Sequence, residues 1–80
     1  MVMAFVMIMV GAGEQLNWDK IVSEKVGKTK NVKEVYHIFG RYDLIVRIEV
    51  EKFEQITTAV EEIRAINGVA STETFIVEKK

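Results

Sequence analysis

The chain has 80 residues, which is one domain near the lower size limit for a single hydrophobic core. Its eleven basic and twelve acidic residues give a formal net charge of −1, so the sequence offers no broad positive surface for nucleic acid. Cysteine is absent, which excludes disulfides and thiolate metal sites, so we expect this small domain to gain stability by forming a homo-oligomer.

The opening segment, residues 1–10, is apolar throughout. It is too short to span a bilayer, which takes roughly 20 apolar residues, and no basic residue precedes it as in a secretory signal. We therefore expect a central strand over about Val2 to Val10, buried on both faces, and no contact with a membrane. Since a chain without cysteine fits a reducing compartment, the expected location is cytoplasmic.

A helix is predicted next, over about Glu14 to Val26, with Gly27 as its stop. Its apolar residues recur at helical spacing on one face. They are Trp18, Ile21, Val22 and Val26. A second strand is expected over about Val32 to Phe39, where β-branched and aromatic residues predominate.

After a turn at Gly40, the alternation of apolar residues from Leu44 to Val50 predicts a third strand. A second helix should cover about Lys52 to Ala65. The stripe that we expect to face inward consists of Phe53, Ile56, Val60 and Ile63. The Asn-Gly pair at residues 67–68 indicates a turn, and a fourth strand should run from about Val69 to Glu78.

The predicted order β-α-β-β-α-β is that of a ferredoxin-like α+β fold. This fold has a four-stranded antiparallel sheet with both helices on one face. Apolar residues, including Tyr36, Ile38 and Ile45, would remain on the other face, and large exposed apolar patches usually mark interfaces. We therefore expect two copies to pack sheet to sheet as a dimeric α/β sandwich.

The sequence lacks the residue sets of common catalytic and cofactor sites. One histidine, no cysteine and no glycine-flanked serine exclude a nucleophilic triad, and residues 11–13 are too short a fragment of a nucleotide-binding loop. His37 stands alone on its strand, so it has no companion ligands for a metal ion. We expect no enzyme activity, no cofactor and no metal.

Two segments supply groups that suit a small zwitterion. The turn Gly40–Asp43 can present backbone N–H groups to an anion, with a carboxylate beside it for a cation. Thr72 and Thr74 offer hydroxyls that both donate and accept. A free amino acid needs both kinds of partner. The residues leave open the alternative that Asp43 only caps the turn and that the threonines only favour the strand.

The pattern Gly40-x-Tyr42-Asp43-Leu44, followed by a helix, Gly68-Val69 and Thr72-x-Thr74, resembles the ligand-binding (RAM) domain of Lrp/AsnC-type feast/famine regulators. The likeness covers nearly the whole chain as a single domain, residues 1–80. It implies sheet-mediated dimers that often assemble into an octamer of four dimers. It also implies an effector, typically an amino acid, at the contact between dimers.

By position, the resemblance assigns one wall of the effector site to Gly40, Arg41, Tyr42, Asp43 and Leu44, with hydroxyls from Thr72 and Thr74. In full-length relatives a helix-turn-helix domain precedes this one. Because the first strand begins near Met1, we expect no DNA-binding domain and no direct DNA contact. The chain would be a sensor that modulates transcription by assembling with full-length Lrp/AsnC regulators.

Two positions depart from the family pattern. Arg41 fills a position that is often acidic or small, and Glu73 places a charge between the threonines. Arg41 could hold a ligand carboxylate with two hydrogen bonds or pair with a carboxylate of a neighbouring subunit. Two other functions stay open: a small ferredoxin-like dimeric monooxygenase using His37, Tyr36 or Trp18, and a purely structural assembly domain.

Overall fold

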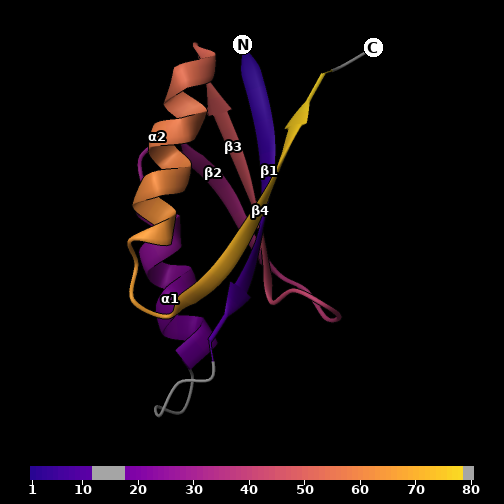
Figure 1. The fold of residues 1–80 in the computed structure, drawn as a ribbon, viewed down its shortest axis with the longest axis vertical. Coiled ribbons are helices and arrows are strands. Elements are labelled where there is room, and N and C mark those ends of the chain that lie inside the picture. Colours follow the sequence, from indigo (N-terminus) through magenta and orange to yellow (C-terminus); the bar gives the residue numbers. More distant parts are fainter. Residues whose placement is uncertain (12–17, 79–80) are drawn as a thin grey trace.

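The computed structural model describes residues 1–11 and 18–78 as four strands and two helices in the order βαββαβ (Figure 1). In chain order they are β1 (Val2–Val10), α1 (Trp18–Gly27), β2 (Val32–His37), β3 (Leu44–Val50), α2 (Phe53–Arg64) and β4 (Val69–Val77). None of the described helices is long and apolar enough to cross a membrane.

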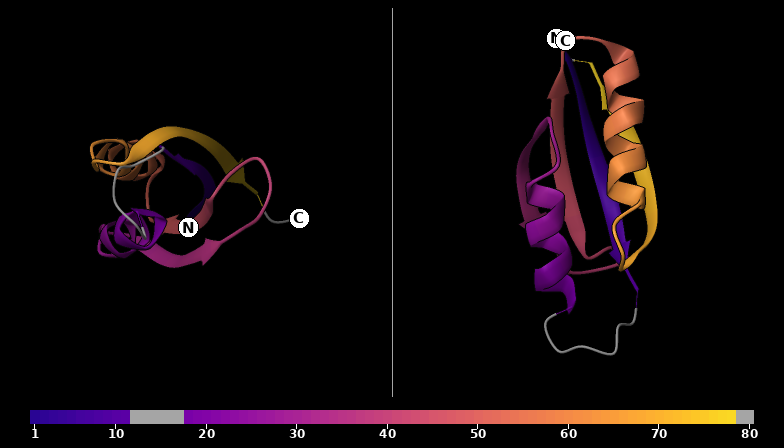
Figure 2. Two further views of the ribbon diagram at one scale, coloured as in Figure 1. Left: turned by 90° about the horizontal axis from the view of Figure 1, so that it is seen from below. Right: turned by 90° about the vertical axis from the view of Figure 1, so that its left-hand side faces the viewer.

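The strands form one antiparallel sheet in the order β2-β3-β1-β4. Both helices cover the same face of this sheet, and the opposite face is left without a covering element of the described chain (Figures 1 and 2). This is the ferredoxin-like arrangement that the sequence predicts. The two central strands, β3 and β1, therefore separate the edge strands β2 and β4.

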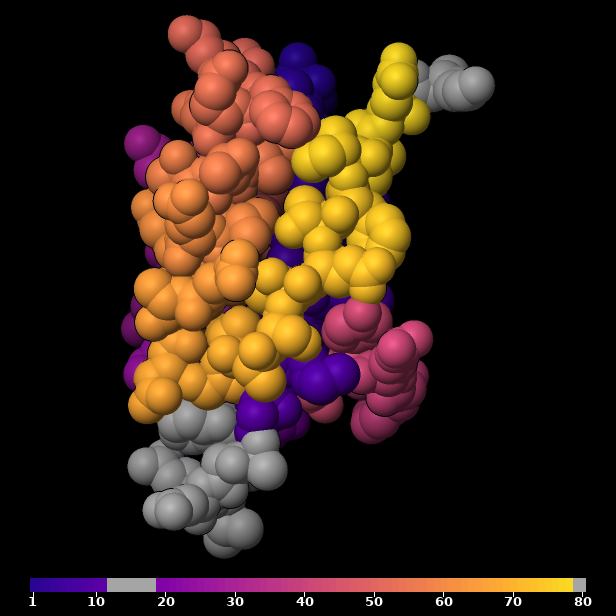
Figure 3. All heavy atoms as spheres, in the orientation of Figure 1, coloured from indigo at the N-terminus to yellow at the C-terminus, as the bar shows by residue number. Residues whose placement is uncertain are grey.

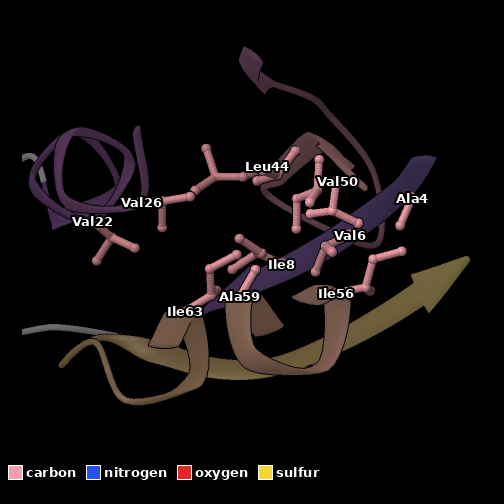
Figure 4. Close-up of a cluster of buried hydrophobic side chains, with 12 residues drawn as sticks. Ala4, Val6, Ile8, Val22, Val26, Leu44, Val50, Ile56, Ala59 and Ile63 are labelled. Atoms are coloured by element: carbon pink, nitrogen blue, oxygen red, sulfur yellow. The ribbon is translucent and has the colours of Figure 1, made fainter. Parts of the chain in front are cut away.

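Alternating residues of β1 and β3 form the floor of the core. Ala4, Val6 and Ile8 of β1 are fully buried on the helix side of the sheet. The helices contribute Val22, Val26, Ile56, Ala59 and Ile63 to the same cluster, which fills the space between the two layers (Figure 4). The expectation that β1 is buried on both faces is wrong for the single chain, because residues facing the open side, such as Met7, are only half-buried.

Most boundaries agree with the predicted elements to within two residues. The expected start of the first helix at Glu14 lies outside the described residues, and β2 ends at His37 rather than Phe39. The helix α2 begins at Phe53, where the Gln55 side chain accepts hydrogen bonds from the N–H groups of Glu51 (3.0 Å) and Lys52 (2.9 Å). Phe53 was expected to face inward, but it lies in the first turn of α2 and is exposed.

The open face of the sheet is rich in apolar side chains. Strand pairing places Tyr36 opposite Ile45 and Ile45 opposite Met7 on this face. Phe5 and Phe75 form a further cross-strand pair there. The Tyr36 and Phe75 side chains are 50% and 49% exposed in the single chain. Large apolar side chains in this position are typical of a surface that another molecule covers.

Candidate functional site

The connection between β2 and β3, residues 38–43, projects from the end of the sheet on the side away from the helices (Figures 1 and 2). We call it the 38–43 loop. Gly40 lies at its tip with φ +139°, a backbone conformation that residues with a Cβ rarely adopt. Apart from its chain neighbours, no atom of the described residues lies within 4 Å of the place that a Cβ would take, so the backbone conformation, not crowding, requires glycine there.

Asp43 fixes the base of the loop with three hydrogen bonds. Its N–H donates to the carbonyl of Ile8 at 2.9 Å, and its carbonyl accepts from the N–H of Ile38 at 3.0 Å. Its carboxylate Oδ2 accepts from the N–H of Val10 at 2.8 Å, at the point where β1 continues beyond the end of β3. One carboxylate oxygen therefore satisfies a strand N–H, as a cap does, while Oδ1 has no hydrogen-bond donor among the described residues.

Tyr42 ties the loop to β4. Its hydroxyl donates a hydrogen bond to the carboxylate of Glu73, 31 residues further along the chain. This hydrogen bond, together with the negative charge of Glu73, raises the pKa of Tyr42 above its ordinary value. Glu73 pairs with Met7 in the sheet register, so it lies on the open face, where the loop can reach it.

Between Asp43 and the Tyr42–Glu73 hydrogen bond, the loop has backbone N–H groups without a partner in the described chain. Among the described residues, no acceptor bonds to the backbone N–H groups of residues 39–42. Arg41, in the middle of this stretch, is exposed. Unpaired N–H groups beside a guanidinium form a favourable environment for an anion such as a carboxylate.

The threonine segment lies on the other side of the sheet. Thr72 pairs with Ile8 and Thr74 with Val6, and these two β1 residues face the helices. Thr72 lines a hollow of about 300 Å³ next to Arg64, and Thr74 lines one of about 350 Å³ between α2 and β4. Within one chain, the structure thus does not bring the threonine hydroxyls together with the 38–43 loop.

Leu44 is also placed differently from the other residues of the predicted wall. Its side chain is fully buried in the core beneath the helices. Only its backbone can therefore face a ligand at the loop. Gly40, Arg41, Tyr42 and Asp43 remain as neighbours that lie on one accessible loop.

A second polar group lies on the open face, and the sequence analysis did not identify it. Arg47 forms ion pairs with Glu34 on β2 and with Glu49 on its own strand, and Tyr36 donates to Glu34. The hydrogen bonds from Tyr36 and Arg47 lower the pKa of Glu34. The same hydrogen bond to Glu34 raises the pKa of Tyr36. The clue in the sequence was the alternation of Arg47 and Glu49 with buried residues, which places both on the open face.

The residues proposed for a monooxygenase do not all lie on one side of the sheet. His37 pairs with buried Leu44 and lies on the helix side of β2, whereas Tyr36 lies on the open face. Trp18 is the first residue of α1, in the helix layer. In the part of the chain that the structure describes, no three His, Asp or Glu residues are grouped so as to hold a metal ion.

The element order and the placing of both helices on one face of the sheet define a ferredoxin-like α+β domain. A family model described as the Lrp/AsnC ligand binding domain matches residues 3–80. The chain therefore belongs to the family of Lrp/AsnC ligand-binding domains, as the resemblance in its sequence predicts.

The relatives among characterised proteins are longer than this chain. It is 33% identical over 78 residues to the HTH-type transcriptional regulator FL11 of Pyrococcus furiosus, which covers 98% of this chain and 49% of the regulator. It is 39% identical over 59 residues to a homocitrate synthase of Sulfurisphaera tokodaii, which covers 74% of this chain and 13% of that enzyme. The chain thus spans about half the length of the regulator, and each likeness concerns one domain.

Solved structures share the whole fold. The protein TTHA0845 from Thermus thermophilus matches with a TM-score of 0.86 and 27% identity, covering 100% of this chain and 96% of that one. FFRP-DM1 matches with a TM-score of 0.82 and 33% identity, covering 98% and 100%. A feast or famine regulatory protein from M. tuberculosis, solved in complex with L-methionine, matches in fold with a TM-score of 0.82 at 18% identity, covering 100% and 52%.

Proposed function

We propose that this domain is a non-enzymatic amino-acid sensor that modulates Lrp/AsnC-type transcription regulators through ligand-dependent assembly in the cytoplasm. The observation that supports this proposal best is the 38–43 loop, where unpaired backbone N–H groups lie beside a carboxylate oxygen that has no donor among the described residues. Such a loop offers donors for the carboxylate of a free amino acid and an acceptor for its ammonium group.

In the proposed site the carboxylate of the amino acid accepts from the N–H groups of residues 39–42 and from Arg41. The ammonium group donates to Oδ1 of Asp43, since Oδ2 is engaged by Val10. Thr72 and Thr74 of a second copy complete the site, because within one chain they lie on the other face of the sheet. The site therefore requires at least two copies.

The assembly that we propose has two levels. Two copies pack through their open sheet faces as a homodimer, because this buries the apolar side chains that the helices leave uncovered. Four such dimers form an octamer, with effector sites at the contacts between dimers. Full-length Lrp/AsnC regulators would take the place of some copies in this assembly. The near-neutral chain itself makes no direct DNA contact.

The comparisons favour methionine as the first ligand to test. The structural neighbour from M. tuberculosis was solved with L-methionine, and so was a transcriptional regulator from Neisseria meningitidis that shares the fold. The likeness to part of a homocitrate synthase supports a sensing module, since a domain of this kind accompanies an enzyme as well as a regulator. The likenesses to the M. tuberculosis and N. meningitidis regulators are distant in sequence, so all twenty amino acids belong in the test.

The test is thermal unfolding of the chain with and without each amino acid. An effector at 100 times its dissociation constant should stabilise the folded state by about 2.7 kcal/mol, which gives a clear shift in Tm. Asp43→Asn should abolish this shift, because it removes the negative charge that faces the ammonium group. The amide oxygen can still accept from Val10, so the unliganded domain should keep most of its stability.

The control for this experiment is Glu62→Gln on the exposed side of α2, which removes a carboxylate far from the loop and should keep the full shift. If Asp43→Asn also keeps the full shift, the assignment of the site is wrong. If no amino acid shifts the wild-type Tm, the sensing function fails and a purely structural assembly domain is favoured.

A further inference from the structure

Phe39 is a large apolar side chain that nothing in the described part of its own chain covers. It lies on the 38–43 loop, next to Gly40, and it is 101% exposed. In the space-filling view the loop forms a separate projection at the lower right of the molecule (Figure 3). An aromatic ring buries about 150–250 Å² when it is covered, so leaving it in water forgoes a large stabilisation.

A groove with matching properties runs between α2 and β4. Its floor and walls are the apolar side chains of Phe53, Ile56, Val60 and Ile76, with Thr57 and Glu61 on the helix side. The hollow measures about 350 Å³, and Phe53 and Ile76 on its walls are 57% and 47% exposed. It lies where the edge strand β4 (yellow) runs beside α2 (orange) in Figure 3.

The Phe39 side chain cannot fill the groove of its own molecule. The groove opens on the helix side of β4, whereas the 38–43 loop leaves the sheet on the opposite side and is tied by Tyr42 to Glu73 on the open face. The groove carries one charge of each sign, Glu61 and Arg64, and so does the loop, with exposed Arg41 and half-buried Asp43, so opposite charges can pair across the contact.

We propose that Phe39 of one copy inserts into the groove between α2 and β4 of a second copy, and that this contact joins sheet-packed dimers into a closed ring. The Phe39 side chain and the groove are different parts of the chain, so each copy can offer one to a neighbour and the other to a further neighbour, and such head-to-tail contacts produce rings when the rotation closes. Arg41 then lies against Glu61 of the neighbour. The inference rests on the proposed two-level assembly, but not on the binding of an effector.

This contact also completes the site that we propose for the effector. Thr74 and Arg64 line the same groove, on the side of the sheet that the loop of the same chain does not reach. Insertion of Phe39 brings the Gly40–Asp43 segment of one copy close to Thr74 of the next. The ligand would therefore occupy a space that exists only while Phe39 is inserted.

The test is native mass spectrometry of the full chain without added amino acid. Wild type should give assemblies larger than a dimer. Phe39→Ala removes the inserted ring and should reduce them to dimers. Thr57→Arg places a long cation in the groove and should do the same. Thr58→Arg is the matched control, because Thr58 is the next residue on α2 and is also exposed but does not line this groove, so the assembly should persist.

The inference is overturned by large assemblies that survive Phe39→Ala, by equal behaviour of Thr57→Arg and Thr58→Arg, or by wild type that never exceeds a dimer. Conversion of Phe39→Ala to monomers would also contradict it, because Phe39 would then belong to the sheet-to-sheet contact. Circular dichroism checks that each variant is folded. The amino-acid thermal shift is measured separately, so failure of the sensing function is distinguishable from failure of this contact.

Discussion

At the scale of single residues, the sequence left two roles open for Asp43, a structural hydrogen bond and a contact with a ligand. The alternative was that Asp43 only caps its own turn, but its carboxylate accepts from the N–H of Val10 at the end of β1, and Oδ1 still can accept from an ammonium group. Val10 is 33 positions away in the chain, so the contact depends on the register of β1 with β3 and not on local sequence. A motif of four residues could indicate the turn but not this partner.

At Gly40 the backbone conformation alone predicts the effect of a substitution on stability. With φ at +139°, a β-branched residue is forced into a sparsely populated region, at a cost of about 1–3 kcal/mol. Gly40→Val should therefore lower the free energy of unfolding by that amount, measured by urea unfolding. The loss should appear with or without amino acid, because the strain arises in the loop itself.

Arg41→Val is the matched control for Gly40→Val. It introduces the same side chain at the next exposed position, where φ is not positive, and should change stability by much less. Equal losses in the two variants would mean that the loop tolerates a Cβ at Gly40, and that the glycine is not required by its conformation.

At the scale of elements, the regular segments were predictable and the connections were not. The apolar run from Val2 to Val10 and the alternation from Leu44 to Val50 determined both central strands, because one face of each packs against helices. The second strand was predicted two residues too long, since β-type residues continue to Phe39 while the chain already turns outward at Ile38. The strand propensity of Ile38 and Phe39 favours a longer strand. The regular pairing of β2 with β3 nevertheless ends at His37 and Leu44, next to the hydrogen bonds that Asp43 makes with Ile8 and Ile38.

The tie between the 38–43 loop and β4 predicts a shifted phenol titration. Tyr42 donates to the Glu73 carboxylate, and its pKa is raised, so the tie is intact below pH about 10 and is lost as the pH rises through the raised pKa. In a Tyr36→Phe background Tyr42 is the remaining tyrosine, and its phenolate absorbance should therefore titrate above the usual pH.

Glu73→Gln in the same background tests the cause. The amide oxygen can still accept from the Tyr42 hydroxyl, so the hydrogen bond, which is the main cause of the raised pKa, can persist, while the negative charge that adds to it is gone; the pKa should therefore fall only part of the way toward about 10. An unshifted titration in the Tyr36→Phe protein would contradict the Tyr42–Glu73 contact. The loop would then be held at its base by Asp43 alone.

At the scale of the whole molecule, five large exposed apolar side chains fall on three separate surfaces. Tyr36 and Phe75 lie on the open face of the sheet, Phe53 and Ile76 line the groove beside α2, and Phe39 projects from the loop. The sequence predicted the open face, because two helices cannot cover both sides of one sheet. It could not predict the groove, which forms where two elements distant in the chain meet.

The ion-paired residues on the open face bear on how a second copy would cover it. Glu34, Arg47 and Glu49 lie together on β2 and β3, next to the apolar residues. Because these charges already pair within one chain, covering them costs less than burying an unpaired charge. A partner sheet can therefore pack on the apolar residues without supplying a counter-charge for Arg47.

Ile45→Lys tests the sheet-to-sheet dimer directly. Ile45 lies on the open face between Met7 and Tyr36, so a lysine there would have to be buried without a partner, which strongly disfavours association. We expect monomers in analytical ultracentrifugation, and a Tm that no longer rises with protein concentration as it does for a dimer. Thr58→Lys adds the same charge on exposed α2 and should leave the dimer intact. A dimeric Ile45→Lys variant would mean that copies associate through another surface, and that the open face keeps its apolar side chains for a different partner.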